Sequence, residues 1–242
     1  MRDRVGFWAA ILTVLVTATF AVAGVATPAR SGPFCGPTTW ACVPAPYTDV
    51  AQLIPGDYLW LVPGLLLAPV VVVLMAAIHA AAPEPRNIFS RIALALALAY
   101  AVVIGADYFG QFAVVIPSLR AGETEGLSLL TQYNPHGLFI AGEALGYLAL
   151  SAAFLFAAPV FAGRGIERAI GWLSVGGFVL AVAAFMGLWI VGHDLTAFEI
   201  AVISINWIVL IGSGVLLSVV FRRALRATTG SRPSREPEAR AR

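Results

Sequence analysis

The chain has 242 residues, of which 60% are hydrophobic and only 12% are charged, and its formal net charge is +2. Soluble domains carry about 25% charged residues, so this composition excludes an ordinary soluble domain with a water-covered surface. The length allows one compact helical bundle and no separate soluble domain. We expect membrane lipids as partners and no nucleic acid.

Six apolar runs are each long enough to cross a bilayer, because a hydrocarbon core about 30 Å thick needs roughly 20 helical residues. Backbone amides cannot remain unpaired in lipid, so these runs must be helices. The sequence therefore predicts an all-α, polytopic membrane protein, with a single six-helix bundle over residues 1–226 and a disordered, basic tail over residues 227–242. The predicted spans are about Val5–Val25, Tyr58–Ala82, Ile92–Pro117, Gly137–Phe161, Ile170–Val191 and Phe198–Phe221.

The basic residues, all of them Arg, predict the orientation. They gather at both ends of the chain and in alternate loops, as expected where positively charged loops stay in the cytoplasm. We therefore predict a multi-pass protein of the cell membrane with both termini in the cytoplasm. The basic residues on that side are Arg2, Arg4, Arg86, Arg91, Arg164, Arg168, Arg222, Arg223 and Arg226, with Arg232, Arg235, Arg240 and Arg242 in the tail.

The first span has a second interpretation as a cleaved secretory signal peptide, because two Arg residues precede it and small residues follow it. Its apolar stretch is longer than the 7–15 residues usual for such a peptide. A retained helix is therefore favoured, and the remaining topology is the same in both cases.

The two cysteines, Cys35 and Cys42, both fall in the first loop, which the charge pattern places outside the cell. Thiols in an oxidising compartment form disulfides, and a short closed loop would hold the segment Pro33–Pro46, which is rich in Pro and Gly. A metal site would need more ligands, and this loop has no His. We predict a structural disulfide.

Polar side chains inside the spans are few, and each is informative because an ionisable group costs about 2.5–3.5 kcal/mol at the centre of a membrane helix. Asp107 and Gln111 lie one turn apart in the third span, and Glu143 and Tyr147 one turn apart in the fourth. Asn206 belongs to a polar stripe in the sixth span. These positions fall in the outer half of the predicted bundle, which predicts a polar cavity open to the outside, with Asn206 at its floor.

Three functions remain open on this evidence. The first is binding or transport of a small or amphiphilic ligand by Asp107, Gln111, Glu143, Tyr147 and Asn206. The second is a membrane enzyme acting on a lipid or isoprenoid, with Asp107 and Glu143 as acid and base. The third is a structural or assembly subunit whose polar residues only join helices, since interhelical hydrogen bonds contribute about 0.6 kcal/mol on average. The sequence specifies neither a cofactor nor an oligomeric state.

Metal or haem binding is the minority interpretation of the histidines. His136 and His193 both fall near the predicted outer boundary, with Asp194 close in sequence. No short-spaced motif such as H-E-x-x-H occurs, and there is no glycine-rich phosphate loop or G-x-S-x-G elbow. We therefore predict no metal site.

Three stretches carry a resemblance to known sequences. They are Ala106–Gln111 (ADYFGQ), Gly126–Tyr147 (GLSLLTQYNPHGLFIAGEALGY) and Ser204–Val209 (SINWIV). The chain resembles uncharacterised prokaryotic six-helix integral membrane proteins, which are grouped only as domains of unknown function. The similarity covers most of the chain from Tyr58 to Phe221. It lies in the layout of the sequence more than in a diagnostic motif. It implies a six-helix bundle and transfers no catalytic residue.

Overall fold

The computed structural model of the chain describes residues 1–32, 35, 42–191 and 195–230. Within these residues the fold is all-α, and six helical segments are long and apolar enough to span a membrane. The predicted fold class is therefore confirmed. The α-helices are α1 (Arg2–Ala26), α2 (Leu61–Ala81), α3 (Asn87–Gly110), α4 (Ile116–Ala121), α5 (Leu138–Ala157), α6 (Ile166–Val191) and α7 (Leu195–Gly230).

The third span is built from three helical segments in succession. A π-helix, η5 (Gln111–Val115), joins α3 to α4, and the apolar span runs from Glu84 to Ala121. The π-helix ends two residues before Pro117, which has no backbone N–H to donate within a helix. Short 3₁₀ turns occupy the other connections: η2 (Ala51–Leu53), η3 (Gly56–Tyr58), η4 (Glu84–Arg86), η6 (Leu127–Leu129) and η7 (Ala158–Phe161).

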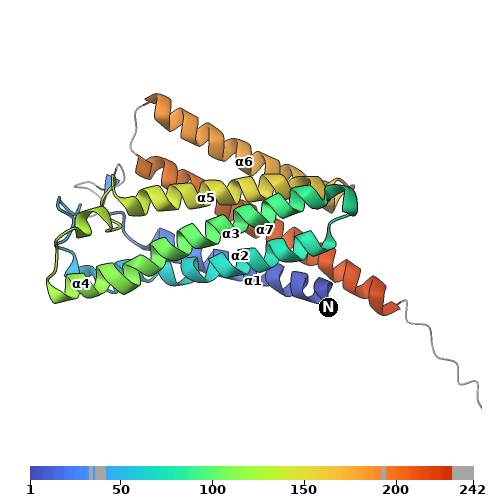
Figure 1. Cartoon of the computed structure of the whole chain (residues 1–242), viewed down its shortest axis with the longest axis horizontal. Coiled ribbons are helices and arrows are strands. Elements are labelled where there is room, and N and C mark those ends of the chain that lie inside the picture. Colours follow the sequence, from blue (N-terminus) through green and yellow to red (C-terminus); the bar gives the residue numbers. More distant parts are fainter. Residues whose placement is uncertain (33–34, 36–41, 192–194, 231–242) are drawn as a thin grey trace, which may run out of the picture.

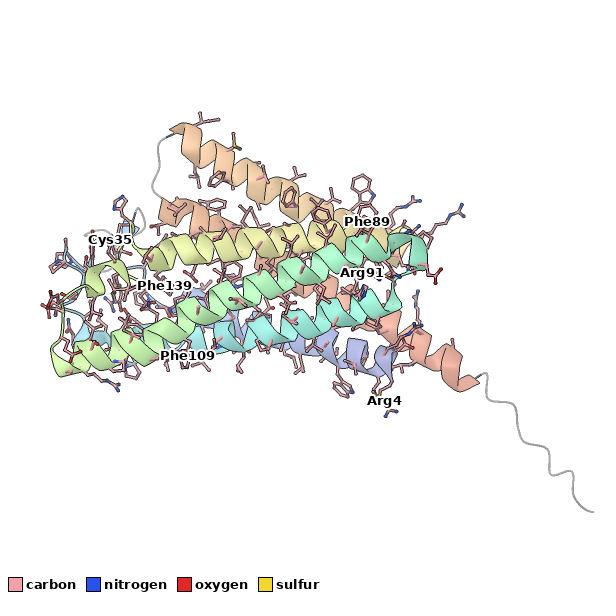
Figure 2. All side chains as sticks on the ribbon, in the orientation of Figure 1. Arg4, Cys35, Phe89, Arg91, Phe109 and Phe139 are labelled. Atoms are coloured by element: carbon pink, nitrogen blue, oxygen red, sulfur yellow. A yellow bond between two sulfur atoms is a disulfide. The ribbon has the colours of Figure 1, made fainter. Side chains whose placement is uncertain are left out.

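The bundle has two chemically different ends, which Figure 2 shows at the left and the right of the molecule. We call the end with Cys35 and the connections from α1 to α2 and from α4 to α5 the disulfide end. The opposite end, the arginine end, carries Arg4 and Arg91 together with the N-terminus. The halves of the bundle next to them are the disulfide half and the arginine half.

The disulfide between Cys35 and Cys42 is present, with the two Cα atoms 5.4 Å apart. This confirms the predicted pairing. A backbone hydrogen bond from Val43 N to Arg30 O, 2.8 Å long, holds the segment after the disulfide against the segment that follows α1. The disulfide therefore closes a loop beside Arg30.

Helix packing is uneven across the bundle. Helices α1, α2, α3, α5 and α7 contact one another along their lengths, whereas α6 diverges from α5 towards the disulfide end (Figure 1). The buried residues of α6 form one stripe of small and medium side chains that ends at Ala181. Beyond it, a contact between the rings of Phe185 and Phe198, 5.1 Å between centroids, joins α6 to α7.

The last helix is longer than its predicted span. Helix α7 continues to Gly230, four residues into the segment 227–242 that we predicted as a disordered tail. The remainder of that segment, residues 231–242, lies outside the described residues.

Candidate functional site

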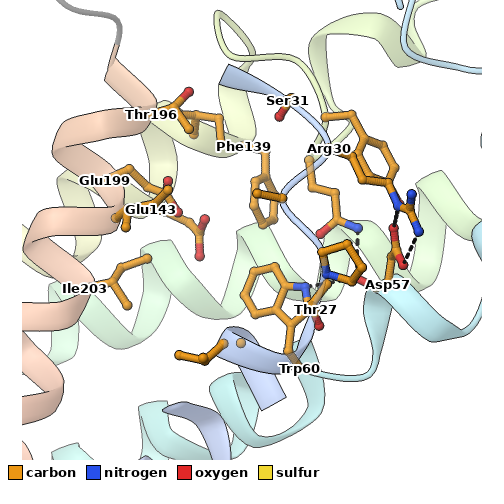
Figure 3. Close-up of a pocket in the computed structure, with 18 of the residues that line it drawn as sticks. Thr27, Arg30, Ser31, Asp57, Trp60, Phe139, Glu143, Thr196, Glu199 and Ile203 are labelled. Atoms are coloured by element: carbon orange, nitrogen blue, oxygen red, sulfur yellow. Dashed lines mark hydrogen bonds and ion pairs between the residues drawn. The ribbon is translucent and has the colours of Figure 1, made fainter. Parts of the chain in front are cut away.

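A cavity of about 290 Å³ lies at the disulfide end, between α1, α5, α7 and the segments that follow α1 and precede α2 (Figure 3). Its wall combines acidic, aromatic and aliphatic side chains. The residues that matter for its chemistry are Phe20, Arg30, Asp57, Trp60, Phe139, Glu143, Glu199 and Trp207.

Two carboxyl groups from different helices meet at one side of the cavity. Glu143 of α5 is only 1% exposed and Glu199 of α7 is 8% exposed. Both carboxyl groups line the same cavity. Two helices therefore each contribute an acidic side chain to one side of the cavity.

Two buried tyrosines lie next to this acid pair, on the side away from the disulfide end. The hydroxyl of Tyr108 on α3 donates a hydrogen bond to Glu143 Oε1, and it lies 3.2 Å from the hydroxyl of Tyr147 on α5. All of these side chains are buried. Glu143 is thus oriented by a hydrogen bond from α3.

An ion pair bounds the opposite side of the cavity. Arg30, in the segment after α1, donates from Nε to Oδ2 of Asp57, which lies in the η3 turn before α2. The hydroxyl of Tyr133 donates to the same oxygen at 3.2 Å, and burial, with smaller contributions from Tyr58 and Asp57, raises the pKa of the Tyr133 phenol well above its usual range. Tyr133 is therefore a neutral donor. The ion pair lies within the connection from α1 to α2, and Tyr133 ties it to the connection from α4 to α5.

The backbone at Asp57 is held as firmly as its side chain. Its carbonyl oxygen accepts hydrogen bonds from Trp60 Nε1 at 2.9 Å and from Gln132 Nε2 at 3.1 Å. The indole of Trp60 is thereby fixed in orientation at the wall of the cavity.

Aromatic rings separate the acid pair from the ion pair. Phe20 and Trp60 stack with centroids 5.8 Å apart, and Trp60 meets Phe139 edge to face at 6.1 Å. Trp207 meets Phe20 edge to face at 5.2 Å. Figure 3 shows Trp60 and Phe139 between the two charged groups.

Of the residues predicted for the site, Glu143 lines the cavity, whereas the four others belong to contacts outside its described lining. Gln111 donates from Nε2 to Leu130 O at 2.6 Å, which ties the end of α3 to the following connection. Tyr147 is fully buried beside Tyr108.

Asn206 joins α7 to α5 through its side-chain amide. Its Nδ2 lies 3.1 Å from Tyr147 O, 2.8 Å from Ser151 Oγ and 2.8 Å from Val202 O. These contacts are those of a residue that holds helices together. They place Asn206 one layer below the acid pair.

Asp107 is half-buried on α3, where its carboxylate faces the backbone of Gly142 on α5. A side chain at Gly142 would bring a Cβ within 2.9 Å of Asp107 Oδ2, and that oxygen has no hydrogen-bond partner among the described residues. Asp107 therefore lies at the contact between α3 and α5.

Several residues of the site were missed by the sequence analysis: Tyr108, Glu199 and the Arg30–Asp57 pair. A signal for Tyr108 exists, because Tyr100, Ile104 and Tyr108 recur every fourth residue and form the buried face of α3. The sequence offers no comparable signal for the ion pair, whose two residues lie 27 positions apart within one connection.

The metal interpretation finds no support in the part of the chain that the structure describes, where no group of three or more His, Cys, Asp or Glu side chains is arranged to hold a metal ion. His193 and Asp194 lie outside the described residues. His136 is exposed at the disulfide end.

Comparison of the chain with family models, with curated proteins and with solved structures finds no match. The resemblance to prokaryotic six-helix membrane proteins therefore stays a prediction.

Proposed function

We propose that this membrane protein binds a small or amphiphilic ligand in the cavity at its disulfide end. The observation that carries the proposal is the position of the buried pair Glu143 and Glu199, which lines a cavity of about 290 Å³. Burying carboxyl groups is costly in a membrane protein, and such groups by default indicate a functional site. The volume is close to the lower bound of ligand pockets, about 300 Å³, and fits a small ligand or the head of an amphiphile.

The distribution of charge supports an orientation in which the cavity faces the outside of the cell. Arg4 and Arg91 lie at the arginine end, and positively charged loops stay in the cytoplasm. The disulfide lies at the opposite end, as expected for an oxidising compartment. The proposal therefore places both termini in the cytoplasm.

Apolar packing below the cavity favours a one-sided binding site over a continuous pore. Val71, Leu74, Ala97 and Leu217 are completely buried in the arginine half. They come from α2, α3 and α7, so three helices contribute apolar side chains to the interior below the cavity. The ligand would enter and leave from the disulfide end.

The enzyme hypothesis is less well supported than binding. It requires Asp107 and Glu143 to reach one substrate atom, whereas Asp107 lies at the contact between α3 and α5 and does not line the cavity. The purely structural hypothesis fits Asn206, which joins two helices, but it does not explain a cavity beside a buried acid pair.

Native mass spectrometry of the purified protein tests the proposal, with two leucine substitutions on α7 as a matched pair. Ser204 lines the cavity, whereas Ser218 is partly buried on the same helix and lies outside the described lining. We expect the wild-type protein and Ser218→Leu to retain a small molecule that Ser204→Leu loses. If all three proteins show the same bound species, the cavity is not the binding site.

A further inference from the structure

A second hollow of the molecule lies in the arginine half, between the first turns of α1 and the middle of α2. This α1/α2 groove measures about 450 Å³. Three of its lining residues, Trp8, Leu12 and Val73, are large apolar residues with exposed side chains. The groove therefore opens to the outside of the bundle, where a membrane protein meets lipid. It is separate from the cavity at the disulfide end.

The groove has one charged end and an apolar remainder. Arg4, Trp8 and Leu12 of its lining recur every fourth residue, so they lie on one face of α1. At 1.5 Å per residue they extend about 12 Å along the helix. Arg4 lies at the arginine end (Figure 2), and Trp is common at the level of lipid headgroups. The order Arg, Trp, Leu thus follows the order of headgroup, interface and acyl chain in a lipid leaflet.

The guanidinium of Arg4 is exposed, and among the described residues no ion pair or hydrogen bond to it is found. Its neighbour Arg2 differs in both respects that matter. Arg2 forms an ion pair with Asp3 at 3.4 Å, and it donates a hydrogen bond to Ala80 O at 3.1 Å, which ties the start of α1 to the end of α2. Arg4 is therefore the basic side chain that can receive an anion at the groove.

The chemistry of the lining selects the class of anion. A planar guanidinium can donate two parallel hydrogen bonds to a phosphate group. No acidic side chain belongs to the described lining of the groove, so a cationic choline or ethanolamine headgroup would find no counter-charge there. Basic pockets between transmembrane helices are typical sites for anionic lipid headgroups. Charge complementarity therefore favours a phospholipid with a net negative headgroup over a zwitterionic one.

We propose that the α1/α2 groove binds an anionic phospholipid of the leaflet next to the arginine end. The lipid phosphate lies against the Arg4 guanidinium, and one acyl chain lies along Ala9, Leu12 and Val73. Because the groove and the cavity are at different ends of the bundle, this site does not depend on the proposed function.

The test is native mass spectrometry of the purified full chain, titrated with phosphatidylglycerol or with phosphatidylcholine of identical acyl chains. Each Arg near a membrane surface attracts anionic lipid by about 1 kcal/mol, and about 1.4 kcal/mol corresponds to a tenfold change in affinity. We therefore expect the first phosphatidylglycerol to bind about fivefold more tightly than the first phosphatidylcholine.

One matched pair of substitutions tests the charge. Arg4→Gln removes the guanidinium from the groove, and it should lower the affinity for phosphatidylglycerol about fivefold, to that for phosphatidylcholine. Arg91→Gln removes an exposed Arg of α3 at the same end of the bundle (Figure 2) and outside the described lining. It should leave both affinities unchanged.

A second pair tests the groove itself. Val73→Phe fills the hollow, and it should lower the affinity for both lipids by about fourfold for each methylene group that it displaces, at about 0.8 kcal/mol for each. Val102→Phe places the same side chain at an exposed position of α3 outside the described lining. It should change neither affinity.

Three results would overturn the proposal. Equal affinity of the wild-type protein for the two lipids would remove the preference for an anionic headgroup. An equal loss in Arg4→Gln and Arg91→Gln would assign the attraction to the overall charge of this end, and unchanged affinity in Val73→Phe would show that no acyl chain occupies the groove. A dimer that persists in phosphatidylglycerol and dissociates in Val73→Phe would identify a second copy of the chain as the occupant in place of a lipid.

Discussion

The disulfide half and the arginine half of the bundle bury their polar groups in different ways. In the disulfide half, carboxyl groups from α5 and α7 face a cavity, and Glu143 accepts a hydrogen bond from Tyr108 of α3. In the arginine half, Ser174 donates to a carbonyl oxygen of its own helix at 2.8 Å, and Ser90 donates to Asn87 O at 3.0 Å and lies 2.8 Å from His79 Nδ1 of α2. The same apolar helices pass through both halves, so the placement of a few polar groups, and not mean hydropathy, distinguishes the two.

The strongest test of this difference places the same acid in each half of α7. Ile203 lines the cavity, whereas Leu217 is completely buried in the arginine half. We expect Leu217→Asp to abolish the folded protein, because a carboxylate costs about 2.5–3.5 kcal/mol at the centre of a membrane helix. Ile203→Asp should fold with a smaller loss, since the cavity admits water. Size-exclusion chromatography and thermal unfolding measure both, and equal losses would show that the two halves do not differ.

A smaller effect is expected where α1 and α7 pack closely below the cavity. A Cβ at Gly214 would lie 3.0 Å from the backbone oxygen of Ala10, which cannot move aside as a flexible side chain can. We expect Gly214→Val to lower the free energy of unfolding by about 1–3 kcal/mol, the usual cost of overpacking. The control is Gly105→Ala on α3, where nothing lies within 4 Å. It should be neutral or stabilising, and a matching loss there would mean that helix contact is not the cause.

Asn206 lies where the two halves meet, and its removal should have an intermediate effect. Asn206→Ala loses the side-chain links from α7 to Tyr147 O and Ser151 Oγ. At about 0.6 kcal/mol for each interhelical hydrogen bond, we expect a loss of about 1 kcal/mol in unfolding by denaturant. Ser174→Ala removes only a bond within α6 and should change stability less than Asn206→Ala does.

An effect of similar size is expected at the ion pair of the disulfide end. Tyr133→Phe removes one hydrogen bond to Asp57 and keeps the ring, so we expect a loss of about 0.5–1.5 kcal/mol. The melting temperature in nanodiscs measures it. Because Arg30 remains paired with Asp57, this variant should retain the same small molecule as the wild-type protein in native mass spectrometry. Loss of that molecule would move the centre of binding to the ion pair.

The six spans were predictable from the sequence because length and hydropathy are properties of a continuous stretch, and the bilayer sets the required length. Helix α7 is longer than the predicted span because its last turns, after Phe221, carry polar residues. A span predicted from hydropathy ends where the apolar run ends, even if the helix continues. The disulfide was predictable because two cysteines in one loop leave a single pairing.

The site was less predictable because it depends on which helices are neighbours. Asp107 and Tyr108 are adjacent in sequence, and only the packing of α3 against α5 directs the tyrosine to Glu143 and leaves the aspartate at Gly142. From the sequence alone, Glu199 is interpreted as a residue at the membrane boundary, because the residue that it faces, Glu143, lies on another helix. Hydropathy along one helix contains no information about which side chains of other helices will face it.

The hydrogen bonds at Asp57 have an evolutionary consequence. This residue receives donors from the segment after α1, from Trp60 and from the connection that precedes α5. If a descendant chain lost the carboxylate alone, the Arg30 guanidinium, whose side chain is 17% exposed, would be left without its counter-charge in a confined environment. Substitutions at these two positions should therefore become fixed together, and the connections from α1 to α2 and from α4 to α5 should diverge together.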